Sequence, residues 1–240
     1  MELKNLETNT STKNMSDNLS VKEKFFSKIS HDLRGSFTSI LGFSDILNDP
    51  NEELTRTEIS DFVTRIGKQS QDSFELLVNF INWLKLENFN SGLTKEKLEL
   101  LDLIYSIQNL NLKKINEKNI SIEYEIPESD YFIMDYEIAH SIFNNIFVFL
   151  TKSCSKNSNI LFKSVQPSNN STVIEIIANC SGNEESFYQN IDVRDLNNDL
   201  SFPIIFAIKF AELSGGKFKF SVDKTNTIII ELELPKELNF

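Results

Sequence analysis

Apolar residues recur at every third or fourth position through the first third of the chain, which is the spacing of an amphipathic helix. A first set of such positions comprises Phe26, Ile29, Leu33, Phe37 and Ile40. A second set comprises Ile59, Phe62, Val63, Ile66, Phe74, Leu77, Ile81 and Leu84. The turn Asn48-Asp49-Pro50 separates the two sets, because the residue before a proline leaves the helical region. The pattern therefore predicts a hairpin of two helices, one from about Ser20 to Asn48 and one from about Glu52 to Glu87.

Beyond Leu98 the pattern alternates between helical runs and runs of period two. It predicts helices at 101–117, 136–152 and 203–213, and strands at 120–125, 131–134, 160–164, 172–177, 217–222 and 227–234. Mixed strands with helices on one face make an α+β sandwich. We therefore expect an α+β chain with a disordered polar leader over 1–19, the helical hairpin over 20–90 and the sandwich over 96–236.

The 240-residue chain carries a net charge of −11, which argues against a general binder of nucleic acids or anionic membranes. Its two cysteines, Cys154 and Cys180, indicate no disulfide framework and suit a reducing compartment. No apolar run reaches the length of a membrane span. These features predict a cytoplasmic protein with neither a nucleic acid nor a membrane as its partner.

His31 lies about 165° from the apolar stripe of its predicted helix, on the face that meets water. Cationic and small residues share that face, namely Lys24, Ser27, Lys28, Arg34, Gly35 and Thr38. A single histidine on a helix surface usually has no special role, so the position alone decides little. The residues that surround it in the sequence carry more information.

The segment around His31 reads Phe26-x-x-Ile29-Ser30-His31-Asp32-Leu33-Arg34 and continues with Ser39-Ile40-Leu41-Gly42-Phe43. It resembles the phosphoacceptor box of two-component histidine kinases. This resemblance implies that His31 carries a phosphoryl group and that Asp32 polarises its ring, leaving the far nitrogen to attack. It also implies that the hairpin pairs with that of a second copy into a four-helix bundle, since one hairpin alone cannot bury its apolar stripes.

Two residues depart from the family pattern inside this box. Gly35 stands where the family has Thr or Asn, whose side chain positions a water for phosphatase action, so we expect weak phosphatase activity. Ser36 stands where the family has a proline, so the helix keeps a backbone hydrogen bond and runs straighter. In the same box, we expect Lys28 and Arg34 to offset the charge of a phosphoryl group.

The second half of the chain resembles the ATP-binding domain of the same kinases, so the resemblance spans roughly Val21 to Pro235. Asp135 matches the aspartate that opens a helix in that domain. Asn145-Ile146 and Lys152 fit the family box N-L-x-x-N-A-x-K, and the segment 212–217 fits E-L-H-G-G-K.

The nucleotide-binding elements implied by this resemblance are degenerate. Phe149 replaces the asparagine that holds Mg²⁺, and an aromatic ring cannot ligate a hard cation. Asn179 replaces the aspartate that reads adenine. The phosphate loop falls on 199–203, where Asp199, Ser201 and Pro203 replace glycines, so backbone N–H groups cannot approach a phosphate closely. We therefore expect no bound nucleotide or metal and no autokinase activity, with Phe149 in the core or in the vacated cavity.

These features favour a dimeric histidine phosphotransferase that carries a phosphoryl group on His31 between the receiver domains of response regulators. The chain would bind no cofactor itself, because the partner receiver brings its own Mg²⁺ and aspartate. Two alternatives stay open: a non-catalytic pseudokinase that docks or sequesters receivers or a histidine kinase, and an active soluble histidine kinase. We interpret His140 as structural, because no second ligand stands at metal-binding spacing.

Overall fold

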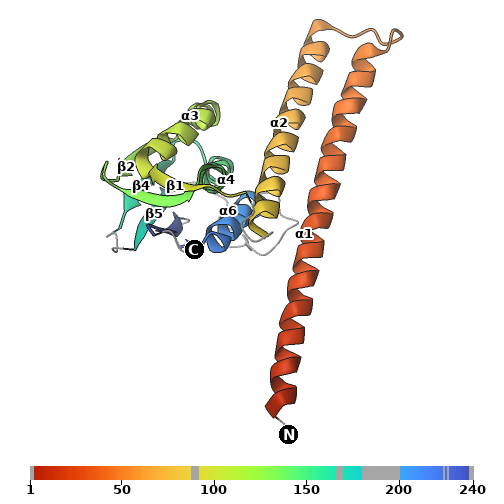
Figure 1. Ribbon diagram of the computed structural model, residues 1–240. Coiled ribbons are helices and arrows are strands. Elements are labelled where there is room, and N and C mark those ends of the chain that lie inside the picture. Colours follow the sequence, from red (N-terminus) through yellow and green to blue (C-terminus); the bar gives the residue numbers. More distant parts are fainter. Residues whose placement is uncertain are drawn as a thin grey trace. The chain divides into compact units, whose positions relative to one another are not determined.

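The computed structural model describes residues 3–87, 92–165, 170–179, 201–223, 225 and 227–237, and the side chains of these residues except 3–22, 24, 25 and 201. The chain divides into two compact units, Met1–Ile81 and Asn82–Phe240. The first unit is a helical hairpin and the second combines helices with β-sheet (Figure 1). The predicted α+β fold class, a helical hairpin followed by a sheet domain, is confirmed.

The first helix, α1 (Leu3–Asn48), begins well before the predicted start at Ser20. This helix covers most of the predicted leader over 1–19, whose disorder stays a prediction. The physical reason for the early start lies in the sequence, since neither glycine nor proline occurs before Gly35. Extending an existing helix costs far less than nucleating one, so polar residues with modest helix propensity can continue it.

The second helix, α2 (Arg56–Glu87), begins four residues after its predicted start at Glu52. A capping box at Thr55 and Glu58 sets this start. The backbone N–H and the hydroxyl of Thr55 donate to Glu58 Oε2 at 2.9 and 2.7 Å, and the Glu58 N–H donates back to Thr55 Oγ1 at 3.3 Å. These bonds hold the pKa of the exposed Glu58 carboxyl below its usual value, the Thr55 hydroxyl contributing most.

Aromatic pairs fix the register of the antiparallel hairpin. The rings of Phe26 and Phe80 meet edge to face at 5.5 Å, and those of Phe43 and Phe62 stack at 5.6 Å. Ile29 is 2% exposed between the helices. A second apolar stripe on α2 is left exposed and comprises Ile59, Val63, Phe74, Leu77 and Ile81.

The second unit is built on a five-stranded sheet in the order β2-β4-β5-β7-β6. Its strands are β2 (Ser121–Glu125), β4 (Asn159–Ser164), β5 (Ser171–Asn179), β6 (Lys217–Val222) and β7 (Thr227–Pro235). Only β2 and β4 are parallel; the other neighbours in this sheet run antiparallel. The core side of the sheet presents fully buried residues at alternate positions, including Ile160, Phe162, Ile174, Ile176, Ile228 and Ile230.

Three helices, α3 (Leu100–Lys118), α4 (Tyr136–Ser153) and α6 (Ser201–Leu213), pack on this side of the sheet (Figure 1). A smaller antiparallel ribbon joins β1 (Lys95–Glu99) to β3 (Tyr131–Asp135). The sequence did not predict β1, because four of its five residues, Lys-Glu-Lys-Leu-Glu, are charged and give no alternating pattern.

The last turns of α2 belong to the second unit. Asn82, Trp83 and Leu86 are buried. The side-chain amide of Asn82 donates to Ser141 Oγ at 2.7 Å and to the carbonyl oxygen of Glu137 at 3.3 Å. The end of α2 is thus bonded to α4 by polar contacts. Residues 88–91, which follow α2, lie outside the described part of the chain.

Candidate functional site

His31 projects from α1 into solvent, with 83% of its side chain exposed. The helix continues without interruption through Gly35 and Ser36, as the absence of a proline predicted. The position follows from the helical period alone, because the apolar residues two positions away, Ile29 and Leu33, are directed to the other side. The imidazole is therefore accessible to another macromolecule.

A chain of contacts runs from His31 through Asp32 to Lys28. His31 Nδ1 lies 3.2 Å from Asp32 Oδ1. Lys28 Nζ donates to the same oxygen at 3.1 Å and lies 2.9 Å from Asp32 Oδ2. A carboxylate only accepts hydrogen bonds, so this contact places the ring proton on Nδ1 in the neutral imidazole. The lone pair of Nε2 is then available for attack on an electrophile.

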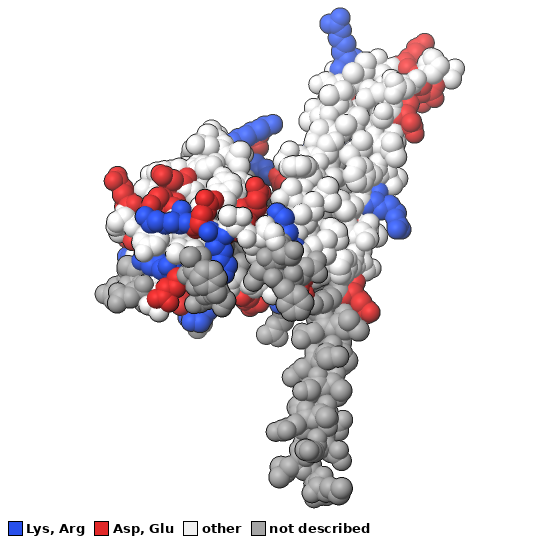
Figure 2. Space-filling view, viewed as in Figure 1, with Lys and Arg blue, Asp and Glu red and all other residues white. Residues whose placement is uncertain are grey.

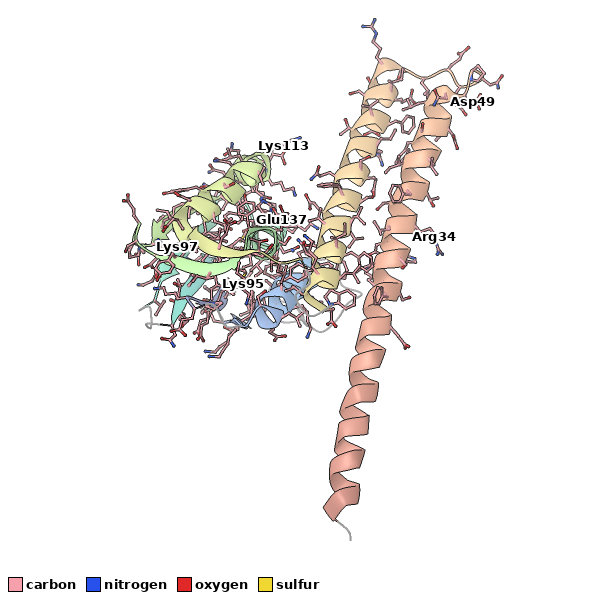
Figure 3. The ribbon with its side chains drawn as sticks, in the orientation of Figure 1. Arg34, Asp49, Lys95, Lys97, Lys113 and Glu137 are labelled. Carbon is pink, nitrogen blue, oxygen red and sulfur yellow. The ribbon has the colours of Figure 1, made fainter. Side chains whose placement is uncertain are left out.

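The other residues predicted for this site, Lys28, Arg34 and Gly35, differ in their contacts and exposure. Arg34 is exposed and projects from α1 (Figure 3). Lys28 is bonded to the Asp32 carboxylate, a contact that sequence reasoning missed although its spacing of four residues is typical of helical ion pairs. At Gly35 a Cβ would meet no atom within 4 Å, so a larger side chain fits there. The roles of Lys28 and Arg34 toward a phosphoryl group stay predictions.

The positions expected to bind nucleotide are described only in part. Phe149 is fully buried, and its ring meets that of Phe220 edge to face at 5.6 Å, so it belongs to the core. Asn145, in the same helix, donates to the carbonyl oxygen of Ser141 at 2.8 Å. Phe149 thus places an aromatic ring where the family pattern has an oxygen ligand. The absence of a bound magnesium–nucleotide group stays a prediction.

Asn179 and Pro203, two further positions where the family pattern has nucleotide-binding residues, lie at the edges of the described chain. The Asn179 side chain accepts a hydrogen bond from the Thr227 hydroxyl at 3.3 Å. Pro203 is buried in the first turn of α6, where a missing N–H costs no helical hydrogen bond. Asp199 and residues 180–200 in general lie outside the described residues, and so does the side chain of Ser201.

Some of the charged groups on the second unit form ion pairs with each other. Figure 2 shows lysines beside aspartates and glutamates over its visible face. The pairs on the outer side of the sheet include Lys217 with Glu233 and Lys163 with Glu125. His140 is half-buried on α4, and burial lowers its pKa, with Glu137 acting weakly in the opposite direction. Within the described residues, no cluster of three or more His, Cys, Asp or Glu side chains could hold a metal ion.

Among the helices in the described part of the chain, none has the length and apolar character needed to cross a bilayer. No model of a known protein family matches the sequence. The hybrid signal transduction protein dokA of Dictyostelium discoideum is 32% identical over 113 residues, which make up 45% of this chain. The matched part covers only 7% of the length of dokA.

Solved histidine kinases share the architecture. The histidine kinase AdeS of Acinetobacter baumannii superposes with a TM-score of 0.65 at 11% identity, covering 86% of this chain and 98% of that one. The histidine kinase ThkA, solved in complex with the response regulator protein TrrA, gives a TM-score of 0.58 at 18% identity over 99% of this chain and 68% of ThkA. At these identities the likeness shows the fold alone, which is a helical hairpin followed by a sheet domain as in these kinases.

Proposed function

We propose that this chain is a dimeric histidine phosphotransferase of a phosphorelay, which receives and returns a phosphoryl group on His31. The observation that carries the proposal is the exposed imidazole whose Nδ1 faces Asp32 while Nε2 remains open to solvent. The resemblance of the surrounding box to histidine kinases agrees with this use of the ring. The partners would be receiver domains of response regulators, the class of protein with which ThkA was solved.

The transfer step needs little from the chain itself. The Nε2 lone pair of His31 attacks the phosphorus of an aspartyl phosphate on the receiver. An N–P bond forms, the P–O bond to the aspartate breaks, and its electron pair returns to the receiver's carboxylate. His31 keeps its proton on Nδ1, and the negative Asp32 balances the charge that develops on the ring. The reverse step on a second receiver completes the relay, with Mg²⁺ held by that receiver.

The second unit supports a role without ATP. The buried Phe149 and the proline in the first turn of α6 both stand where the family pattern has groups that contact nucleotide. A phosphotransferase has no need of these groups, because the phosphoryl group arrives already activated. A homodimer agrees with the exposed stripe on α2, since burial of such side chains stabilises association.

The test is to incubate the purified chain with receiver domains whose aspartate has been phosphorylated by acetyl phosphate, and then to map acid-labile phosphate. We expect the label on His31, and its loss in His31→Ala. The fold of this variant should be unchanged by circular dichroism, because the side chain is 83% exposed and packs against little. Label that reaches another residue, or none in the presence of every receiver tried, would contradict the proposal.

The second candidate function is a non-catalytic pseudokinase, which the buried Phe149 and the proline in the first turn of α6 suit equally well. A receiver that binds the chain tightly but never passes its phosphoryl group to His31 would favour it. An active kinase is separated from both by incubation with γ-labelled ATP and Mg²⁺. Label on His31 in that experiment would replace the phosphotransferase proposal with autokinase activity.

A further inference from the structure

Lys28 contacts the site from the turn that precedes His31. Its ammonium group reaches both oxygens of the Asp32 carboxylate, at 3.1 and 2.9 Å. Only 17% of the Lys28 side chain is exposed, against 26% for Asp32 and 83% for His31. The lysine therefore lies along the helix surface beside the carboxylate and does not extend into the solvent where a phosphoryl group would arrive.

We propose that Lys28 is a positioning residue, which holds the Asp32 carboxylate against Nδ1 of His31 and so keeps Nε2 available for phosphoryl transfer. This inference rests on the function proposed above, because it concerns the same imidazole. It differs from the expectation that Lys28 neutralises the phosphoryl group directly. The lysine acts through Asp32, and it need not touch the substrate.

The geometry gives the lysine two effects on the ring. By contacting both oxygens it restricts rotation of the carboxylate, which otherwise has several rotamers on an exposed helix. Its positive charge also offsets part of the negative charge that Asp32 presents to the imidazole. The fixed orientation of the carboxylate favours the neutral tautomer with the proton on Nδ1.

Other charged groups near the site are the same in the wild type and in the variants at position 28. Among the described side chains of α1, the exposed Arg34 is one such group. The aromatic pairs of the hairpin place Asp72 and Glu75 of α2 at about the height of His31. Glu75 accepts a hydrogen bond from Gln71 at 3.1 Å. Differences between variants at position 28 therefore report on the lysine itself.

The first measurement is the tautomer of the His31 ring by ¹⁵N NMR at a pH where the imidazole is neutral. The chain holds only two histidines, so His140→Gln identifies the signal of His31. We expect the Nδ1–H form in the wild type and a mixture of tautomers in Lys28→Met, which keeps the apolar stem but loses the charge. Lys28→Arg should restore the Nδ1–H form. As a control, Arg34→Gln removes a cation that takes no part in the contacts among Lys28, Asp32 and His31. It should leave the tautomer unchanged.

The second measurement is the rate of phosphoryl uptake from a phosphorylated receiver. In Lys28→Met fewer rings hold the Nδ1–H tautomer, and only a ring with a free Nε2 lone pair attacks. The rate should therefore fall about two- to fivefold, as expected for loss of a partly exposed ion pair.

The two measurements separate failure of this inference from failure of the proposed function. A wild-type chain that takes up no phosphoryl group would overturn the phosphotransferase, while the tautomer would still test the role of Lys28. An unchanged tautomer in Lys28→Met would overturn the positioning role, whatever the absolute rates. A loss of rate in that variant with an unchanged tautomer would indicate direct contact of the lysine with the receiver or the phosphoryl group.

Discussion

At the scale of single residues, the site depends on the spacing of side chains along one helix. The helical period alone places His31 on the exposed face, so sequence was sufficient to find it. The same period places Lys28 within reach of both Asp32 and solvent. Which of the two it contacts depends on side-chain rotamers, and these are decided by local packing that a helical wheel does not contain.

Gly35 offers a prediction about phosphatase activity. Gly35→Asn and Gly35→Thr should dephosphorylate a cognate receiver faster than the wild type, because the new side chain can position a water against the aspartyl phosphate. The backbone is helical at this residue and a Cβ would meet no atom within 4 Å, so both side chains fit. The rate of loss of receiver phosphate, measured with each variant in excess, tests this.

The matched control for these variants is Gly35→Ala. It should stabilise the helix by about 1 kcal/mol, since alanine has the higher helix propensity, yet it adds no group that could hold a water. Equal hydrolysis by the alanine and asparagine variants would show that helix stiffness matters and that the polar side chain does not.

At the scale of elements, most of the predicted helices and strands lie within one or two residues of the observed ones. The misses have separate causes. The charged strand β1 lacks an alternating pattern, and α1 extends toward the N-terminus because no residue interrupts it. The start of α2 is set by the bonds between Thr55 and Glu58, which outweigh the propensity of the residues before them.

Asp135 connects three elements and should be important for the stability of the second unit. Its Oδ1 caps α4 by accepting from the N–H groups of Glu137 and Ile138 at 3.0 and 3.3 Å, and its Oδ2 accepts from Thr94 N–H at 2.8 Å. Asp135→Ala should lower the free energy of unfolding by about 1–2 kcal/mol, since it leaves these donors unsatisfied.

Asp135→Asn serves as the control in the same urea titration, because an asparagine oxygen still caps the helix. We expect it to lose much less stability than the alanine variant. Equal midpoints for the wild type and Asp135→Ala would mean that water replaces the cap at no cost.

At the scale of the whole molecule, the sequence predicted the order of hairpin and sheet domain, because the hydrophobic period changes from one half to the other. It could not predict how the nucleotide elements are packed. That Phe149 lies in the core against Phe220 depends on contacts between α4 and β6, which are more than sixty residues apart in the sequence. Much of the remaining segment falls outside the described residues.

The exposed stripe of α2 predicts a dimer that a single charge would disrupt. Leu77→Glu should yield a monomer at micromolar concentration, because its side chain is 42% exposed on the hairpin and would be desolvated only on association. Light scattering gives the mass directly. Thr64→Glu adds the same charge on a different face of α2 and should remain dimeric. A wild-type chain that is already monomeric at this concentration would contradict the dimer.

The burial of Asn82, Trp83 and Leu86 has a practical consequence for dividing the protein into separately expressed pieces. A cut after Glu87 would separate Asn82 from the sheet domain and would deprive Ser141 of its amide donor. A fragment of the sheet domain should therefore begin ahead of Asn82. The fluorescence of Trp83, the single tryptophan, would then report whether that fragment has folded.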